Sequence, residues 1–157
     1  MVTGENTSTT LASPADIERV EFPALDAYSD IVHAGGKIHM AHMCGTLHRV
    51  VDALARTRLD GLHDVAPAPT GDLDFKADRQ RLLAAGKCVA GGIDATAFVN
   101  PSPEAIERYV IARLAEAAPG VGFLLSSGDT VPLGTEVETL RRIVRTLERH
   151  GNCPLGA

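Results

Sequence analysis

The stretch KIHMAHMCGTLHRVVDALART, residues 37–57, carries the pattern that decides the fold. Its first part, residues 37–44, is a short and largely apolar run that ends at a glycine, which is typical of a buried strand. Residues 46–57 repeat apolar side chains at the spacing of one helical face, with Leu47, Val50, Val51 and Leu54 on that face. The stretch therefore predicts one strand–helix unit.

Three more units of this kind follow along the chain. Strand-like runs at residues 60–66, 87–93 and 122–127 are each followed by a helical pattern, at 74–85, from 102 and from 135. Strands that alternate with helices of this length predict an α/β fold with a parallel sheet. The spacing of the strands fits both one half of a (β/α)8 TIM-type barrel and an open four-stranded sheet.

The ends of the chain lack this pattern. Residues 1–12 are small and polar, which predicts a disordered lead-in. A helix is expected to start at Ser13, which can cap it, with Pro14 at the first helical position. We expect residues 13–151 to form one domain and residues 152–157 a short tail, since 157 residues suffice for a single domain.

Composition excludes several kinds of partner. The chain has 15 Lys and Arg against 20 Asp and Glu, so no basic surplus exists to bind nucleic acid. No apolar run reaches the length of a membrane span. Three widely spaced cysteines do not form a disulfide framework, and the N-terminal residues do not have the pattern of a secretory signal. We therefore expect a cytoplasmic protein that binds a small molecule, with no nucleic acid and no membrane as partner.

The predicted strand ends carry the residues with chemical potential, and in parallel α/β folds these ends form functional sites. His42 and Cys44 lie two residues apart, so a regular strand points both to one face. Imidazole and thiolate are ligands of zinc, and Asp129 can supply a third ligand from the last strand. A small buried cysteine beside a hydrogen-bonded histidine would give the same pattern.

Further candidates come from the other strand ends. The candidate catalytic residues are Asp129, His63 and Asp94. Paired glycines can mark a close backbone approach to a ligand or tight packing at a strand end. The candidate substrate-binding residues are therefore Gly91, Gly92, Ser127 and Gly128.

Four motifs, in order, make the chain resemble the C-terminal half of the uroporphyrinogen decarboxylase superfamily. They are the His-Met-Cys-Gly strand end at 42–45, the Pro-Thr-Gly-Asp turn at 69–72, the Gly-Gly-Ile-Asp segment at 91–94 and the run APGVGFLLSSGD at 118–129. The resemblance implies a (β/α)8 barrel of which this chain supplies the last four strand–helix units. It places the active site at the carboxyl ends of the strands.

The superfamily includes zinc-dependent methyltransferases that act between corrinoids and thiols, and it includes the decarboxylase itself. In the methyltransferases, the matching His and Cys bind zinc, which assigns His42 and Cys44 as ligands here. The third ligand of that branch is a cysteine, where this chain has Asp129. The decarboxylases have a substrate-facing histidine at the same position. The resemblance thus implies zinc-dependent methyl transfer with a corrinoid as methyl donor, and decarboxylation of a uroporphyrinogen-like acid is the alternative.

The N-terminal half of the family is not represented, and in the decarboxylases it carries Asp and Arg residues that bind the substrate. A half-barrel also leaves open strand edges and an exposed inner face. We therefore expect self-association or pairing with a separate N-terminal half-barrel chain. A truncated, inactive paralogue that acts as a partner subunit is a further, non-enzymatic alternative.

Overall fold

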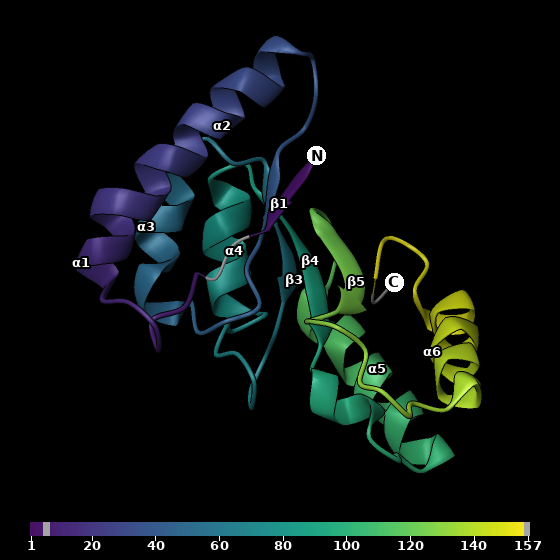
Figure 1. Ribbon diagram of the computed structural model, residues 1–157. Coiled ribbons are helices and arrows are strands. Elements are labelled where there is room, and N and C mark those ends of the chain that lie inside the picture. Colours follow the sequence, from purple (N-terminus) through teal and green to yellow (C-terminus); the bar gives the residue numbers. More distant parts are fainter. Residues whose placement is uncertain (5–6, 156–157) are drawn as a thin grey trace.

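The computed structural model describes residues 1–4 and 7–155, and it contains one sheet of five parallel strands (Figure 1). The strands are β1 (Val2–Gly4), β2 (Met40–His42), β3 (Gly61–Val65), β4 (Cys88–Ile93) and β5 (Phe123–Ser127). The longer helices are α2 (Phe22–Ala34), α4 (Ala77–Ala84), α5 (Pro103–Ala117) and α6 (Val137–His150). The shorter ones are α1 (Pro14–Asp16), the π-helical turn η1 (Ile17–Glu21), the 3-10 turns η2 (His48–Val50) and η3 (Ala95–Phe98), and α3 (Val51–Arg56).

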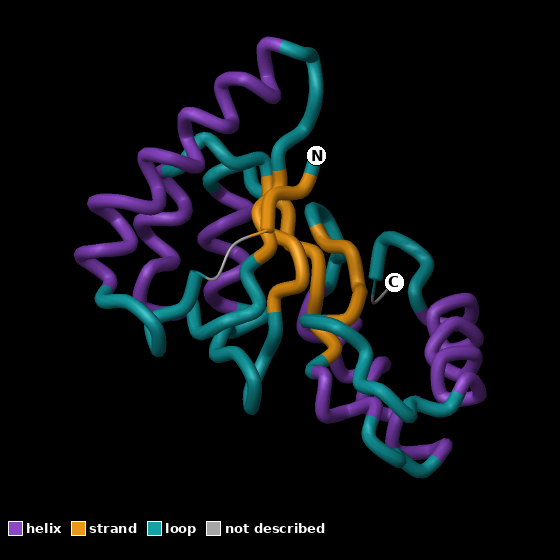
Figure 2. The backbone as a smooth tube through the Cα atoms, viewed as in Figure 1, coloured by secondary structure: helices purple, strands orange, loops and turns teal. Residues whose placement is uncertain are grey.

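The order of the strands in the sheet is the order in the chain, β1-β2-β3-β4-β5, and every neighbouring pair is parallel. A doubly wound open sheet reverses its strand order at a switch point, whereas a barrel adds each strand beside the last. The described strands show no reversal. Figures 1 and 2 show α2, α3 and α4 along one flank of the sheet, with α5 and α6 beyond β5. The arrangement is therefore that of part of a (β/α)8 barrel.

Two apolar clusters bury the outer face of the sheet. The first joins Leu62 and Val89 of the sheet to Leu25, Leu54 and Leu82 of the helices. The second joins Ile93 to Ile106 and Val110 of α5 and to Ile143 of α6. The guanidinium of Arg79 lies between α4 and α5 and donates to the carbonyl oxygens of Phe75, Ala117 and Val121.

The prediction of a disordered lead-in over residues 1–12 does not match the described part of that segment. Val2–Gly4 pairs with Met40–His42, so the sheet has five strands where four were expected. Further along, the Thr9 amide donates to the Thr46 carbonyl oxygen at 2.9 Å. These contacts are made by the backbone, so they could not be predicted from a pattern of apolar side chains. Residues 5 and 6 of the predicted lead-in lie outside the described residues.

Residues 152–157 were predicted as a short tail outside the domain, and in the structure their described part packs against the domain. Leu155 is buried in the second apolar cluster, and its amide donates to the Pro119 carbonyl oxygen at 3.1 Å. Residues 156 and 157 of that tail lie outside the described residues. The segment up to Leu155 thus covers part of the core beside α5 and α6.

Helix starts were predicted with mixed success. The Ser13 hydroxyl accepts from the Asp16 amide, as expected of a cap. Thr135 and Glu138 have the spacing of a capping box, which predicts that Thr135 caps α6. That prediction is wrong, because the Thr135 hydroxyl donates to the Pro132 carbonyl oxygen instead. No described helix is long and apolar enough to cross a membrane.

Candidate functional site

His42, Cys44 and Asp129 converge at the carboxyl end of the sheet. His42 is the last residue of β2, Cys44 follows two residues later, and Asp129 lies two residues after the end of β5. One ligand atom from each of the three side chains lies within 4.8 Å of the other two. All three side chains are partly buried. The structure thus brings together the three residues proposed from the sequence as metal ligands.

The charge distribution of this cluster suits a cation. Burial raises the pKa of the Cys44 thiol, and the neighbouring Asp129 carboxylate raises it further through its charge and a hydrogen bond. Among the described residues, no Lys or Arg side chain forms an ion pair with Asp129 or with the nearby Asp64. A divalent cation would neutralise these groups, and nitrogen, sulfur and oxygen donors together form a set that zinc accepts. The residues present therefore fit a zinc ion.

His63 and Asp64 lie on β3 beside this cluster. The Nδ1 atom of His42 is 3.3 Å from an Asp64 carboxylate oxygen, and Nδ1 of His63 is 3.4 Å from the other. The rings of His42 and His63 have centroids 6.0 Å apart. The structure thus places the predicted catalytic residue His63 in the cluster, together with Asp64, which the sequence did not single out.

Asp94, the third predicted catalytic residue, lies at the end of β4 but does not face the cluster. It is 1% exposed, and its two oxygens accept hydrogen bonds from the amides and hydroxyls of Thr70 and Thr96. The Asp94 amide in turn donates to the Tyr109 hydroxyl at 3.0 Å. Asp94 therefore ties the turn at residues 69–72 to the end of β4, and its oxygens are already occupied.

This geometry predicts an acid-dependent contribution to stability. Burial alone would raise the pKa of Asp94, but the hydrogen bonds from Thr70 and Thr96 outweigh it and lower the pKa below the usual 3.8. The stabilisation is therefore fully present above that value and is lost as pH falls through the lower, folded-state pKa. Asp94→Asn should cost about 1–3 kcal/mol of unfolding free energy at pH 7, with a smaller difference from wild type below pH 4.

Urea unfolding at pH 7, 4 and 3 measures this dependence. Asp52→Asn is the matched control, because the Asp52 side chain is 70% exposed. A difference between Asp94→Asn and wild type that stays constant across these pH values would contradict the assignment.

The three glycines among the predicted substrate-binding residues lie so close to neighbouring atoms that a larger side chain would not fit there. A Cβ atom on Gly91 would lie 2.6 Å from the Val65 nitrogen, and one on Gly128 would lie 2.7 Å from the Ala66 Cα atom. A Cβ atom on Gly92 would press on side chains of β5 and of the segment before α4. The Ser127 hydroxyl donates to the Asp129 carbonyl oxygen and so shapes the loop that carries the carboxylate. Tight packing, one of the two interpretations of the paired glycines, thus accounts for Gly91 and Gly92, and their contact with substrate stays a prediction.

A pocket of about 210 Å³ opens beside Cys44 and was not expected from the sequence. Its lining combines the thiol with hydroxyl groups, from Thr7, Ser8, Thr10, Thr46 and Thr70, and with Leu11 and Gly45. The Ser8 hydroxyl lies 2.7 Å from that of Thr10 and 3.1 Å from that of Thr46, so the lining is neutral and internally hydrogen-bonded. Half of the lining comes from residues 7–11, which carry no apolar pattern. A small uncharged or thiol-bearing group would fit here.

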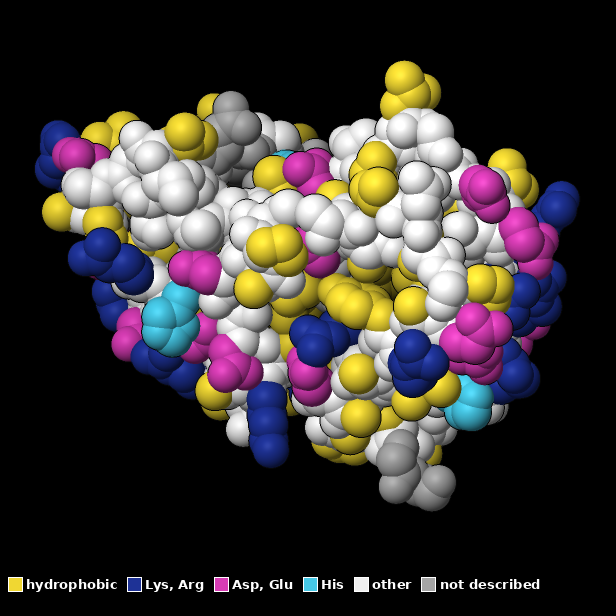
Figure 3. Space-filling view, turned by 90° about the horizontal axis from the view of Figure 1, so that it is seen from below, with side chains coloured by type: hydrophobic (Ala, Val, Ile, Leu, Met, Phe, Trp, Pro, Cys, Tyr) yellow, Lys and Arg dark blue, Asp and Glu magenta, His cyan; other side chains and the backbone are white. Residues whose placement is uncertain are grey.

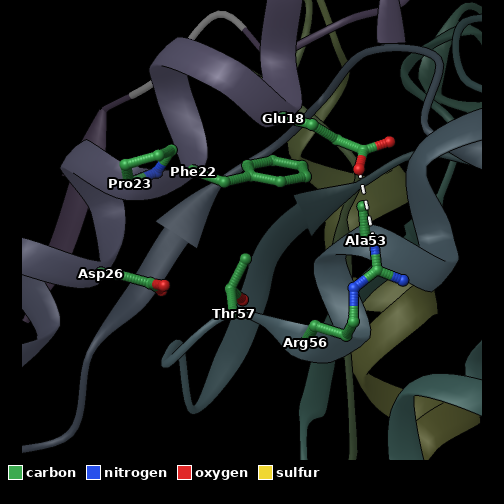
Figure 4. Close-up of a pocket in the computed structure, with 7 residues that line it drawn as sticks. All are labelled: Glu18, Phe22, Pro23, Asp26, Ala53, Arg56 and Thr57. Atoms are coloured by element: carbon green, nitrogen blue, oxygen red, sulfur yellow. Dashed lines mark hydrogen bonds and ion pairs between the residues drawn. The ribbon is translucent and has the colours of Figure 1, made fainter. Parts of the chain in front are cut away.

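Another pocket of about 210 Å³ lies among the outer helices, far from any predicted site residue (Figure 4). Its polar groups include Glu18 and Arg56, which form an ion pair of 3.2 Å across it. Figure 3 shows a different hollow, seen from below, that is floored by hydrophobic side chains and surrounded by charged ones. Among the described residues, none that line the pocket of Figure 4 belong to a group that could hold a metal ion.

Comparisons with known proteins agree with this geometry. A family model described as uroporphyrinogen decarboxylase (URO-D) matches residues 1–150. Among solved structures, a methyltransferase from Methanosarcina mazei is similar with a TM-score of 0.79 and 15% sequence identity. The match covers 96% of this chain and 42% of that one, so the chain spans less than half the length of that structure. No curated protein sequence matches significantly. The predicted superfamily and half-barrel fold are confirmed.

Proposed function

The chain belongs to the uroporphyrinogen decarboxylase family, and on that premise we propose that it takes part in zinc-dependent transfer of a methyl group from a corrinoid to a thiol. The observation that carries this proposal is the convergence of His42, Cys44 and Asp129 within 4.8 Å. A methyltransferase of similar fold is among the structures that the chain resembles.

His42, Cys44 and Asp129 would hold the zinc ion through one nitrogen, one sulfur and one oxygen, which leaves a fourth position for the substrate. When bound, zinc acts as a Lewis acid that lowers the pKa of a coordinated thiol. The pocket beside Cys44 would hold the rest of a small thiol. His42, Cys44 and Asp129 would thereby hold the acceptor thiol as a thiolate, with its proton released to solvent. A methylcorrinoid would supply the methyl group that this sulfur receives, and the electron pair of the broken bond would stay with the corrinoid.

Methyl transfer from methylcobalamin to 2-mercaptoethanol tests this proposal, with the methyl thioether measured by mass spectrometry. We expect the zinc-loaded chain to form thioether above the rate of zinc in buffer. Cys44→Ser should reduce the rate to that background, whereas Cys153→Ser, a change at an exposed cysteine, should leave it unchanged. A rate at background for the wild-type chain, or an equal rate in Cys44→Ser, would contradict the proposal.

Decarboxylation of uroporphyrinogen is the second candidate, since it is the activity in the description of the matched family. Decarboxylation needs no metal, so under this candidate function the rate of uroporphyrinogen turnover should be the same in the wild-type chain and in Cys44→Ser. We expect negligible turnover from this chain, because the decarboxylases bind the substrate through residues of the N-terminal half. Turnover like that of a full-length family enzyme would favour this candidate over methyl transfer.

The proposal includes a partner that completes the barrel. On β5, Phe123 and Leu125 pack against the second apolar cluster, so Leu124 faces the opposite, inner side of the sheet, where it is 59% exposed. On α6, the spacing of Val137 and Val144 places them on one helical face with Leu140, Ile143 and Leu147, which predicts burial, but both valines are exposed. Eight strands fill a barrel of this type, and the described part of the chain forms a sheet of five. A second copy or a separate N-terminal half would cover these surfaces.

Association is therefore expected in solution. Sedimentation equilibrium at micromolar concentration should give a mass above the 16.5 kDa of one chain, because the exposed apolar face and free strand edges are buried by pairing. Leu124→Lys places a charge on the inner face and should shift the mass toward that of the monomer. A folded, non-aggregating monomer of the wild-type chain would contradict this expectation.

A further inference from the structure

A backbone irregularity brings His63 and Asp64 to the same side of the sheet. Consecutive residues of a regular strand point to opposite faces, so only one of the two would face the site. The register between β3 and β4 shifts between Leu62 and Val65, and Asp64 has a left-handed backbone conformation with φ of 56°. Bulges of this kind re-aim side chains beside functional sites. Here the bulge directs both side chains toward His42.

The separations within this group are longer than those of ordinary hydrogen bonds. The Asp64 carboxylate oxygens lie 3.3 Å from Nδ1 of His42 and 3.4 Å from Nδ1 of His63. Nitrogen–oxygen hydrogen bonds are usually about 2.7–3.2 Å long. Ligand atoms at metal–ligand distances of about 2.0–2.1 Å in a tetrahedron lie roughly 3.3–3.4 Å apart. Each separation is thus of the size expected between two ligand atoms of one ion, although the two run to different oxygens of the carboxylate.

The group also contains a polar atom with no hydrogen-bond partner. Nδ1 of His63 is buried and makes no hydrogen bond to any described residue. An unsatisfied buried polar atom is costly, so its occurrence in a native fold calls for a partner such as an ion. Asp64 has no Lys or Arg partner among the described residues, which leaves its negative charge available to a cation.

We infer that His42, His63 and Asp64 form a second metal-binding set, for a divalent ion that accepts nitrogen and oxygen ligands. Their ligand atoms lie within 4.8 Å of one another, like those of the first set. The two sets share the side chain of His42. The second set contains no sulfur and suits harder ions such as Co²⁺, Fe²⁺ or Mn²⁺, which do not require a thiolate. This site does not depend on methyl transfer as the function of the chain.

Cobalt binding in a chain without the first set tests this inference. In Cys44→Ser/Asp129→Asn, only the second set remains intact, and Co²⁺ alone is added to the metal-free protein. We expect about one Co²⁺ per chain by isothermal titration, with no thiolate-to-cobalt charge-transfer band in the absorption spectrum. Adding His63→Ala should weaken binding by at least about tenfold. Adding His150→Ala, at an exposed histidine that ends α6, should leave binding unchanged.

Two results would overturn the inference: absence of Co²⁺ binding in the folded double variant, or binding that His63→Ala does not weaken. Circular dichroism checks the fold of each variant. If the double variant is unfolded, the same Co²⁺ titrations are done with the single variant Cys44→Ser, with and without His63→Ala, and the same two results would overturn the inference. The charge-transfer band in the wild-type chain reports on Cys44 separately, so failure of the second set is distinguishable from failure of the zinc site proposed above.

Discussion

Gly91→Ala is expected to remove most of the folded protein. Gly91 lies in β4, between β3 and β5, with φ of 146°, a conformation that residues with a side chain rarely adopt. Its new Cβ atom would lie 2.6 Å from the Val65 nitrogen and closer still to the Val65 carbonyl oxygen. Both obstacles are backbone atoms of the adjacent strand, so no side-chain rotation can relieve the clash. The unfolding free energy should fall by more than about 4 kcal/mol, a large part of the stability of a small domain.

Gly86→Ala is the matched control for this change. Gly86 also has a positive φ, 79°, but its Cβ atom would meet nothing within 4 Å. We expect it to cost only about 1–2 kcal/mol, the conformational part of the penalty. Soluble yield and urea unfolding followed by circular dichroism compare the two variants. Equal stability of Gly91→Ala and Gly86→Ala would mean that packing against β3 does not fix Gly91, and would favour its interpretation as a substrate contact.

The positions of four strands could be predicted from the sequence because each contains a short apolar run between polar or glycine-rich flanks. The strand at Val2–Gly4 could not, because it is three residues long, is held by backbone pairing to β2 and buries no apolar face of its own. On one face of α6, by contrast, the sequence predicted burial that the structure does not show. Its apolar pattern predicted burial of Val137 and Val144, yet both are exposed because five strands leave that side of the barrel uncovered.

The residues of the candidate site that lie on regular strands or directly after them could be predicted from the sequence. His42 and Cys44 follow the two-residue period of a strand, and the last strand of the same parallel sheet brings Asp129 to the same end. Asp64 could not be predicted, since only the bulge in β3 turns it to the side of His63. The hydroxyl groups of residues 7–10 were missed for a similar reason, because their segment is positioned by hydrogen bonds to Thr46 rather than by a pattern.

Replacement of Cys44 is expected to cause a large loss of bound zinc. Of the three ligands proposed for zinc, the Cys44 thiolate is the only sulfur donor, and sulfur is what distinguishes this set from the sulfur-free set at His63 and Asp64. Serine preserves the size of the side chain but cannot supply a thiolate at neutral pH. We therefore expect Cys44→Ser to fold normally and to lose its zinc to a chelator that the wild-type chain resists.

Elemental analysis after dialysis against a chelator tests the central claim most directly, with circular dichroism as the check on folding. We predict about one zinc per wild-type chain and per Cys153→Ser chain, and much less per Cys44→Ser chain, where only the weaker, sulfur-free set at His42, His63 and Asp64 is left to hold an ion against the chelator. A folded wild-type chain free of zinc after growth and purification with zinc present, or a Cys44→Ser chain that keeps its zinc through dialysis, would contradict it.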